Sequence, residues 1–233
     1  MTLRQKLSNS TALSASDLDI RDLLQNAVNH ARNPNPWDLG NSVLYRLCQE
    51  NSLHNEEQAV LAKIWLIGRS YAAAIERRKP GVEKEENDDF YIETVVPTIR
   101  DSSIDQWISE IKKYKKPTIE SLNDILSVHA NVTNLFAEIS GLQKRSLASK
   151  YLHFHAPELF FIYDTRAVNR INCLSSRLSF QKSITTVEEH DHEYRKFFEK
   201  CLHLQSYIEK EFETLLTPRE LDNLLQLNIE WTI

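Results

Sequence analysis

The sequence predicts an all-α protein, and three observations lead to this prediction. Glycine and proline are scarce, with 4 and 7 residues in a chain of 233, whereas sheet-rich folds use both in their many tight turns. Apolar residues recur at helical spacing along most of the chain. Residues that cap or end helices fall between these apolar stretches. With 41% hydrophobic residues, a chain of this length can bury a full core without disulfides or metal ions.

We expect residues 1–15, which are rich in Ser and Thr, to be a flexible tail, and residues 16–233 to form a single domain. The helix over 55–79 is the most apolar, so we expect it to be central and buried. The acidic segment 83–89 is expected to be a solvated loop. In chain order, helices are predicted over about 16–32, 37–49, 55–79, 90–114, 118–139, 145–155, 165–174, 186–214 and 218–228.

Capping and breaking residues justify the limits of these helices. The segment Asn33-Pro34-Asn35-Pro36 separates the first two helices, because the residue before a proline avoids the helical conformation. Gly141 is expected to end the helix over 118–139. Asp164 is placed to cap the helix over 165–174, and Thr217-Pro218 to open the last one. Pro97 predicts a kink in the helical region over 90–114.

Several functional classes are excluded by simple counts. The four glycines are far apart, so no Rossmann or P-loop phosphate cradle is present. The three cysteines form no C-x-x-C pair, which excludes a four-cysteine iron–sulfur cluster within this chain. We expect reduced thiols, no cofactor and no metal site. No stretch approaches the ~20 apolar residues of a membrane span, and the segment MTLRQKLSNS lacks the apolar part of a signal peptide. A cytoplasmic protein without membrane partners is therefore expected, nucleoid-associated if its host is bacterial.

The distribution of charge points to a phosphate-rich partner. The chain has a net charge of −5, but the segment 140–182 carries a net charge of +5 and the remaining residues −10. A basic segment on an acidic body is an electrostatic footprint for nucleic acid. Solvated surface charge remains the alternative. The basic residues of the segment are Lys144, Arg145, Lys150, Arg166, Arg170, Arg177 and Lys182.

The most informative stretch is 139–174, ISGLQKRSLASKYLHFHAPELFFIYDTRAVNRINCL. A helix ends at Gly141, a tight loop follows, and a new helix begins on polar and basic residues. Loop amides and a helix N-terminus form an anion site, to which Lys144 and Arg145 add charge. After an apolar run, Asp164 stands at the next helix start, with Arg166 and Arg170 following at i, i+4 spacing.

This arrangement resembles the helix-hairpin-helix superfamily of DNA glycosylases. Their pattern is a hairpin of approximately L-P-G-V-G-x-x-T-A, followed after about a dozen residues by V-D-T-H/x-V-x-R. Here the corresponding residues are ISGLQKRSLA, from Ile139 to Ala148, and IYDTRAVNR, from Ile162 to Arg170. The resemblance implies a bilobal helical fold with a helix-hairpin-helix core over about 54–175. It also implies an enzyme that flips a base out of duplex DNA and cleaves its N-glycosidic bond.

The resemblance assigns roles to particular residues. Asp164 would be the catalytic carboxylate, stabilising positive charge on the sugar or orienting water. Gln143 replaces the second glycine of the hairpin, and Ser146 stands where bifunctional members carry a lysine nucleophile, so a monofunctional enzyme is expected. The partner would be double-stranded DNA, bound by a monomer. The DNA-binding residues would be Gly141, Gln143, Lys144, Arg145, Ser146, Arg166 and Arg170. The base pocket would contain Trp65, Arg69, Tyr71, His153 and Tyr163.

Two alternatives stay open at the level of sequence. A non-catalytic helix-hairpin-helix module would use the hairpin only to hold the DNA backbone, with Asp164 acting as a helix cap. A metal-dependent phosphohydrolase of the HD type would need a set of His and Asp ligands. The candidates for such a set are His129, His153, His155, His190, Asp191 and Asp222.

Overall fold

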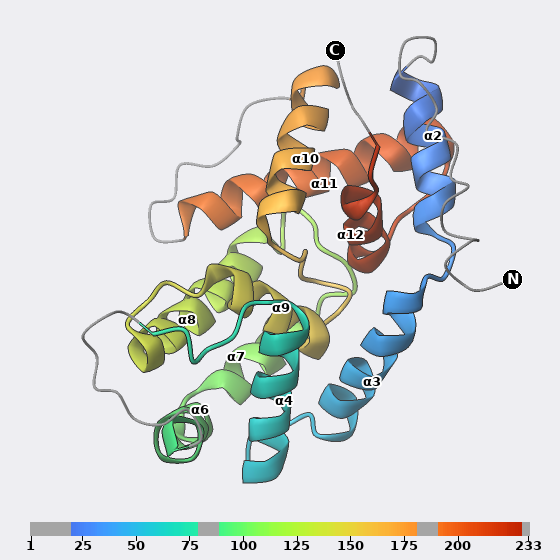
Figure 1. Ribbon diagram of the computed structural model, residues 1–233. Helices are drawn as coiled ribbons and strands as arrows, with labels where there is room; N and C mark the ends of the chain where they lie inside the picture. The colour runs from blue at the N-terminus through green and yellow to red at the C-terminus, as the bar shows by residue number, and fades with distance from the viewer. Residues whose placement is uncertain (1–19, 79–88, 181–190, 230–233) are drawn as a thin grey trace, which may run out of the picture.

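The computed structural model describes residues 20–78, 89–180 and 191–229, and within these ranges the protein is helical without a strand (Figure 1). The all-α prediction is confirmed for this part of the chain. The expected tail over 1–15 lies outside the described residues, as does most of the segment 83–89. The elements are α2 (Ile20–Ala31), α3 (Pro36–Glu50), α4 (Glu57–Ser70), the π-helix η1 (Phe90–Val95), α6 (Val96–Asp101), α7 (Ile104–Ile111), α8 (Leu122–Ser140), α9 (Arg145–His155), α10 (Thr165–Arg177), α11 (His192–Phe212) and α12 (Pro218–Gln226).

The capping residues act as the sequence predicts. The Asp164 carboxylate accepts a hydrogen bond from the Ala167 amide at 2.8 Å, at the start of α10. Thr217 forms a capping box with Glu220 at the start of α12. Gly141 ends α8 with a φ of 71°, a left-handed conformation that glycine adopts without a steric penalty.

The helix predicted over 55–79 is wrong in its second half, because α4 ends at Ser70. The chain then turns back on itself, and the Ala73 amide donates to the Gly68 carbonyl at 2.7 Å. A Cβ atom on Gly68 would lie only 3.2 Å from the Cα of Ala74, so glycine permits this close return. Lys144 then binds the Ala74 carbonyl from a distant part of the chain. Tertiary contacts thus override the helix propensity of the alanines that follow Tyr71.

The region predicted over 90–114 divides into shorter pieces. Its first turns form η1, and the hydrogen bonding changes to that of an α-helix at Val96, beside Pro97. Proline has no amide hydrogen to donate, so such a change of hydrogen-bonding pattern is tolerated there. A second break separates α6 from α7 at Ser102 and Ser103.

The helices fall into two groups in space (Figure 1). One group contains α3, α4, η1 and α6 to α9, with α4 packed against α3, α6 and α9. The other contains α2, α10, α11 and α12, with α12 packed between α2 and α10. One apolar core runs through both groups. None of the described helices combines the length and the hydropathy that a bilayer crossing demands.

Candidate functional site

A cavity of about 750 Å³ opens where the two groups of helices meet. Its wall is formed by the end of α2, one side of α3, the end of α4, the start of α10 and α12. Small-molecule and cofactor sites fall in this size range. The side chains in this wall that matter most for chemistry are Trp37, Asn41, Tyr71, Asp164, Asp222 and Gln226.

Asp164 is fixed in the wall by the segment that precedes it. Leu159, Phe160, Phe161 and Ile162 are all buried in the core, so the backbone that leads to Asp164 is firmly anchored. One carboxylate oxygen caps α10, and the other accepts a hydrogen bond from Gln226 Nε2 at 3.1 Å. The remaining lone pairs of this half-exposed carboxylate are available to the cavity.

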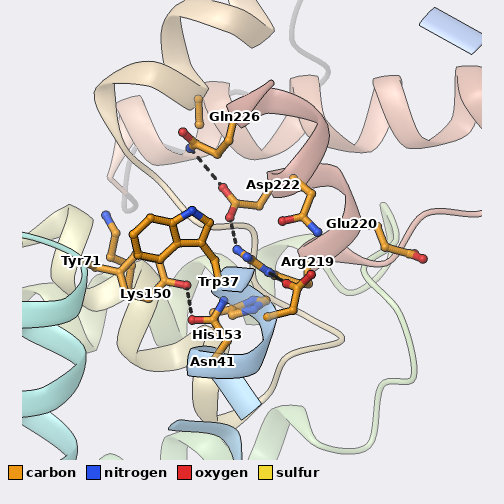
Figure 2. A network of polar contacts seen from close by, with 12 residues as sticks. Trp37, Asn41, Tyr71, Lys150, His153, Arg219, Glu220, Asp222 and Gln226 are labelled. Carbon is orange, nitrogen blue, oxygen red and sulfur yellow. Dashed lines mark hydrogen bonds and ion pairs between the residues drawn. The ribbon is translucent and has the colours of Figure 1, made fainter. Parts of the chain in front are cut away.

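Asp222, on α12, is a second carboxylate in the same wall and is only 5% exposed. Arg219 Nη1 donates to its Oδ2 at 2.5 Å, and Gln226 Nε2 donates to its Oδ1 at 3.3 Å (Figure 2). Burial raises the pKa of Asp222 to about 6; the positive charges of Arg219 and Lys150 oppose this shift, and the negative charge of Asp164 adds to it. The site therefore holds a carboxyl group whose pKa of about 6 lies well above the usual value for an aspartate.

Asn41 contributes a polar group that no described residue binds. Tyr71 Oη donates to Asn41 Oδ1 at 2.9 Å, which fixes the orientation of the amide (Figure 2). Asn41 Nδ2 is buried and has no hydrogen-bond partner among the described residues. A buried donor without a partner costs about 1–3 kcal/mol. Beside Asn41, one turn away on α3, the Trp37 indole is 78% exposed. This face of the cavity combines an aromatic surface with unsatisfied polarity, a combination typical of ligand sites.

Lys150, on α9, lies behind the wall. Its ammonium is buried and donates to Ser146 Oγ at 2.6 Å and to the Tyr163 carbonyl at 2.9 Å. Burial lowers the pKa of Lys150, whereas the negative charges of Asp164 and Asp222 oppose that shift. Lys150 therefore places positive charge near both carboxylates without lining the cavity itself.

Most of the predicted DNA-binding cations contact the protein itself. Lys144 Nζ donates to the carbonyls of Ala74 and Arg77, which closes the turn after α4. Arg145 forms an ion pair with Asp191 at 2.6 Å.

Two further predicted cations lie on α10 and differ from each other. Arg170 donates to the Ile229 carbonyl. Arg166 is exposed at the cavity. Of the four cations in this prediction, Arg166 is therefore the one whose charge faces solvent beside the candidate site.

The rest of the predicted hairpin has mixed roles. Gly141 and Gln143 are exposed in the loop between α8 and α9. Ser146 Oγ donates to the Tyr163 carbonyl at 3.0 Å, so it ties α9 to the segment before Asp164. Two amides of this loop already have partners, since Gly141 N donates to the Ala137 carbonyl at 2.8 Å and Leu142 N to Ser140 Oγ at 3.3 Å.

Of the five predicted base-pocket residues, the structure brings only Tyr71 to the cavity. Trp65 and Arg69 contact each other, with the guanidinium 5.3 Å from the indole centroid. His153 is fully buried between Tyr45 Oη and the Phe160 carbonyl, and burial lowers its pKa to about 4. It is a core histidine whose two ring nitrogens both have partners.

The fifth of these residues, Tyr163, packs against Arg145 and Phe197. Its ring therefore forms part of the packing beside Asp164 and does not line the cavity.

Sequence reasoning missed most of the residues that complete the wall, and it considered Asp222 only as a ligand of the metal-dependent alternative. Trp37 and Asn41 follow the Asn-Pro-Asn-Pro break, and their i, i+4 spacing on a polar helix start was the available signal. Arg219, Asp222 and Gln226 lie on one side of α12 at i, i+3 and i+7 spacing, which by itself is typical of a solvated helix face. Only the packing of α12 over the start of α10 turns them into part of a site.

The metal-dependent alternative finds no support in the described part of the chain, where no three His, Cys, Asp or Glu residues are placed to share a metal ion. Asp191 caps α11 and binds Arg145, and His190 lies outside the described residues. His129 stacks on Tyr194 at 3.5 Å, and Asp222 lies in the cavity.

Comparisons with protein-family models, curated proteins and solved structures find no match to this chain.

Proposed function

We propose that this protein binds duplex DNA and excises a base, using Asp164 to cleave the N-glycosidic bond. The observation that carries the proposal is the position of Asp164. It caps a helix immediately after the α8–α9 hairpin and borders a cavity large enough for a flipped nucleotide. The helix-hairpin-helix resemblance gave Asp164 this role from sequence, and the cavity supplies the space that the role needs.

The chemistry asked of Asp164 is electrostatic. As the glycosidic bond breaks, positive charge grows on the sugar, and a nearby carboxylate stabilises it. The cap and the Gln226 hydrogen bond hold both oxygens of Asp164 in place, so no reorganisation is needed during the reaction. Such fixed groups are typically worth a factor of about 10² to 10³ in rate.

DNA contact in this proposal uses two sets of groups. The amides of Gln143 and Lys144 and of the first turn of α9 would hold a phosphate. Arg166, exposed beside the cavity, would supply a further phosphate contact near the flipped nucleotide. Affinity that falls steeply with salt is expected from such contacts.

The test is turnover on a panel of labelled duplexes with damaged, mismatched or modified bases, with and without EDTA. Strand breaks that appear only after heat and alkali would indicate abasic sites made by a monofunctional enzyme. Asp164→Asn should retain the helix cap, because asparagine caps as well as aspartate. It should also lose about 10²-fold or more of the rate.

Asp124→Asn is the matched control, because Asp124 lies on the surface of α8 with Tyr114 and Lys113 and does not line the cavity. It should cleave as the wild type does. Salt-sensitive binding without cleavage on any substrate would contradict the proposal and favour the non-catalytic DNA-binding module. Cleavage that EDTA abolishes would instead favour a metal-dependent enzyme.

A further inference from the structure

The cavity wall holds two carboxyl groups that share one hydrogen-bond donor. Gln226 Nε2 donates to Asp164 Oδ2 at 3.1 Å and to Asp222 Oδ1 at 3.3 Å, so these two oxygens are no more than 6.4 Å apart. Asp164 comes from the start of α10 and Asp222 from α12. Both line the same cavity. A ligand that enters it therefore meets two carboxyl groups in different surroundings.

The surroundings differ in burial and in charge. Asp164 is half-buried, whereas Asp222 is 5% exposed. The groups that face Asp222 come from every neighbouring element. They are Arg219, Gln226, Asp164, Lys150, and more distantly Tyr45, Tyr71 and Cys201.

Burial favours the neutral form of Asp222, and the cations around it oppose that effect. Its direct cation, Arg219, is shared with Asp38, whose Oδ1 accepts from Arg219 Nε at 3.0 Å. One guanidinium thus serves two carboxyl groups. Burial raises the pKa of Asp222 to about 6 in spite of these cations.

We propose that Asp222 is the proton donor of this site and protonates the leaving base, while the Asp164 carboxylate stabilises positive charge on the sugar. This inference rests on the base-excision function proposed above and names a second catalytic residue for it. It also names a substrate class, namely neutral bases that leave poorly unless a proton reaches the ring. The free Nδ2 of Asn41 and the exposed Trp37 on α3 fit such a planar base, because one donates a hydrogen bond and the other stacks.

The atoms and charges of this step balance. The bond between the sugar C1′ and the base nitrogen breaks, and its electron pair stays with the base. Asp222 gives its proton to the base, which leaves as a neutral molecule. Water adds to C1′, and its released proton returns to the Asp222 carboxylate. The Asp164 carboxylate stabilises the positive charge on the sugar.

The decisive experiment compares two leaving groups in Asp222→Asn. One duplex carries the neutral base that the wild-type protein removes fastest from the panel, and the other carries 7-methylguanine. The methylated base is already cationic and leaves as a neutral molecule without a proton donor. General acid catalysis contributes about 10²- to 10⁴-fold. The Asp222→Asn variant should therefore remove the neutral base at least about 100-fold more slowly than the wild type. Its rate of 7-methylguanine removal, where the wild type shows one, should fall much less.

A pH profile of single-turnover rates on the neutral base is the second readout, and a merely structural role would not produce it. The wild-type rate should fall tenfold per pH unit above about pH 6, as Asp222 loses its proton. Asp222→Asn should be slow and insensitive to pH over the same range. Asp124→Asn, the surface control, should reproduce the wild-type profile. Circular dichroism at each pH checks that all variants are folded.

The outcomes separate this inference from the function on which it rests. If the wild type removes no base from any duplex, the base-excision function is wrong and the inference falls with it. A second outcome is that the wild type removes bases, but the rate of Asp222→Asn still falls above about pH 6 or equals the wild-type rate on the neutral base. In that case the base-excision function stands and Asp222 is not the proton donor. Equal losses on the neutral base and on 7-methylguanine would likewise exclude Asp222 as the proton donor.

Discussion

The α8–α9 hairpin and the cavity wall differ in how their polar groups are satisfied. Around the hairpin, Lys144 binds backbone carbonyls and Arg145 pairs with Asp191. In the cavity wall, Asn41 Nδ2 has no partner among the described residues, and burial raises the pKa of Asp222 to about 6. The first region uses its charges to stabilise the fold, whereas the second leaves polar groups for a ligand.

Clustered charge in a sequence therefore does not by itself locate a binding surface. The segment 140–182 carries a net charge of +5, yet several of its cations are directed at the protein. A buried polar group that lacks a partner and lines a cavity is a stronger indication, because its free-energy cost falls when a ligand or a bound water pairs with it. That indication is visible only in three dimensions.

The largest expected effect concerns the stability contribution of Asp222. Its pKa is raised from 3.8 to about 6 in the folded protein. Below pH 3.8, the ordinary pKa of an aspartate, Asp222 is protonated in both the folded and the unfolded protein, and its full contribution to the free energy of unfolding is present. This contribution is lost as the pH rises through about 6. The shift corresponds to about 3 kcal/mol at most. Between pH 4 and pH 7, urea unfolding should therefore show the wild type losing up to about 3 kcal/mol relative to Asp222→Asn. Parallel curves for the two proteins would contradict the raised pKa.

The next effect in size is expected from filling the cavity without touching its polar groups. Gly40 lines the cavity on α3, and a Cβ atom there would meet nothing within 4 Å. Gly40→Trp should fill the space and lower the rate of base removal about 100-fold, since a displaced substrate loses about that much. Its thermal stability should not fall. Gly40→Ala is the matched control, and it should keep its activity and gain about 0.5–1 kcal/mol from helix propensity. Full activity in Gly40→Trp would mean that the reaction occurs elsewhere.

A third prediction tests the structural role of Lys144. Lys144→Met leaves the carbonyls of Ala74 and Arg77 without their donor, so we expect a loss of about 1–3 kcal/mol in urea unfolding. The salt dependence of DNA binding should not change. Lys115→Met, at an exposed site, is the control and should stay within about 0.5 kcal/mol of the wild type. A shallower salt dependence with unchanged stability would instead place Lys144 on the DNA.

The smallest effect is expected at Arg166, which faces solvent beside the cavity. Arg166→Ala should leave the free energy of unfolding within about 0.5 kcal/mol of the wild type. It should lower DNA affinity uniformly across sequences and reduce the slope of log affinity against log salt by about 1. An unchanged slope in a salt titration would remove Arg166 from the DNA-binding surface.

The sequence alone determined the helical class, most helix limits and the position of Asp164. These features are local: the Asp164 and Thr217 caps, the left-handed Gly141 and the Pro34 break each act within a few residues. The end of α4 at Ser70 was not predictable in this way. It depends on Lys144, which lies 70 residues away from the Ala74 carbonyl that it binds.

The candidate site was predictable only in part, for the same reason. Asp164, Arg166 and Tyr71 were found from motif and position, and all three line the cavity. Asn41 and Gln226 became functional candidates only through packing, and only packing placed Asp222 beside Asp164, because α12 and α3 approach the start of α10 from distant parts of the sequence. Local chemistry fixes where a helix begins and ends, whereas burial, shared donors and shifted pKa values arise from which helices meet, and the tertiary structure alone decides that.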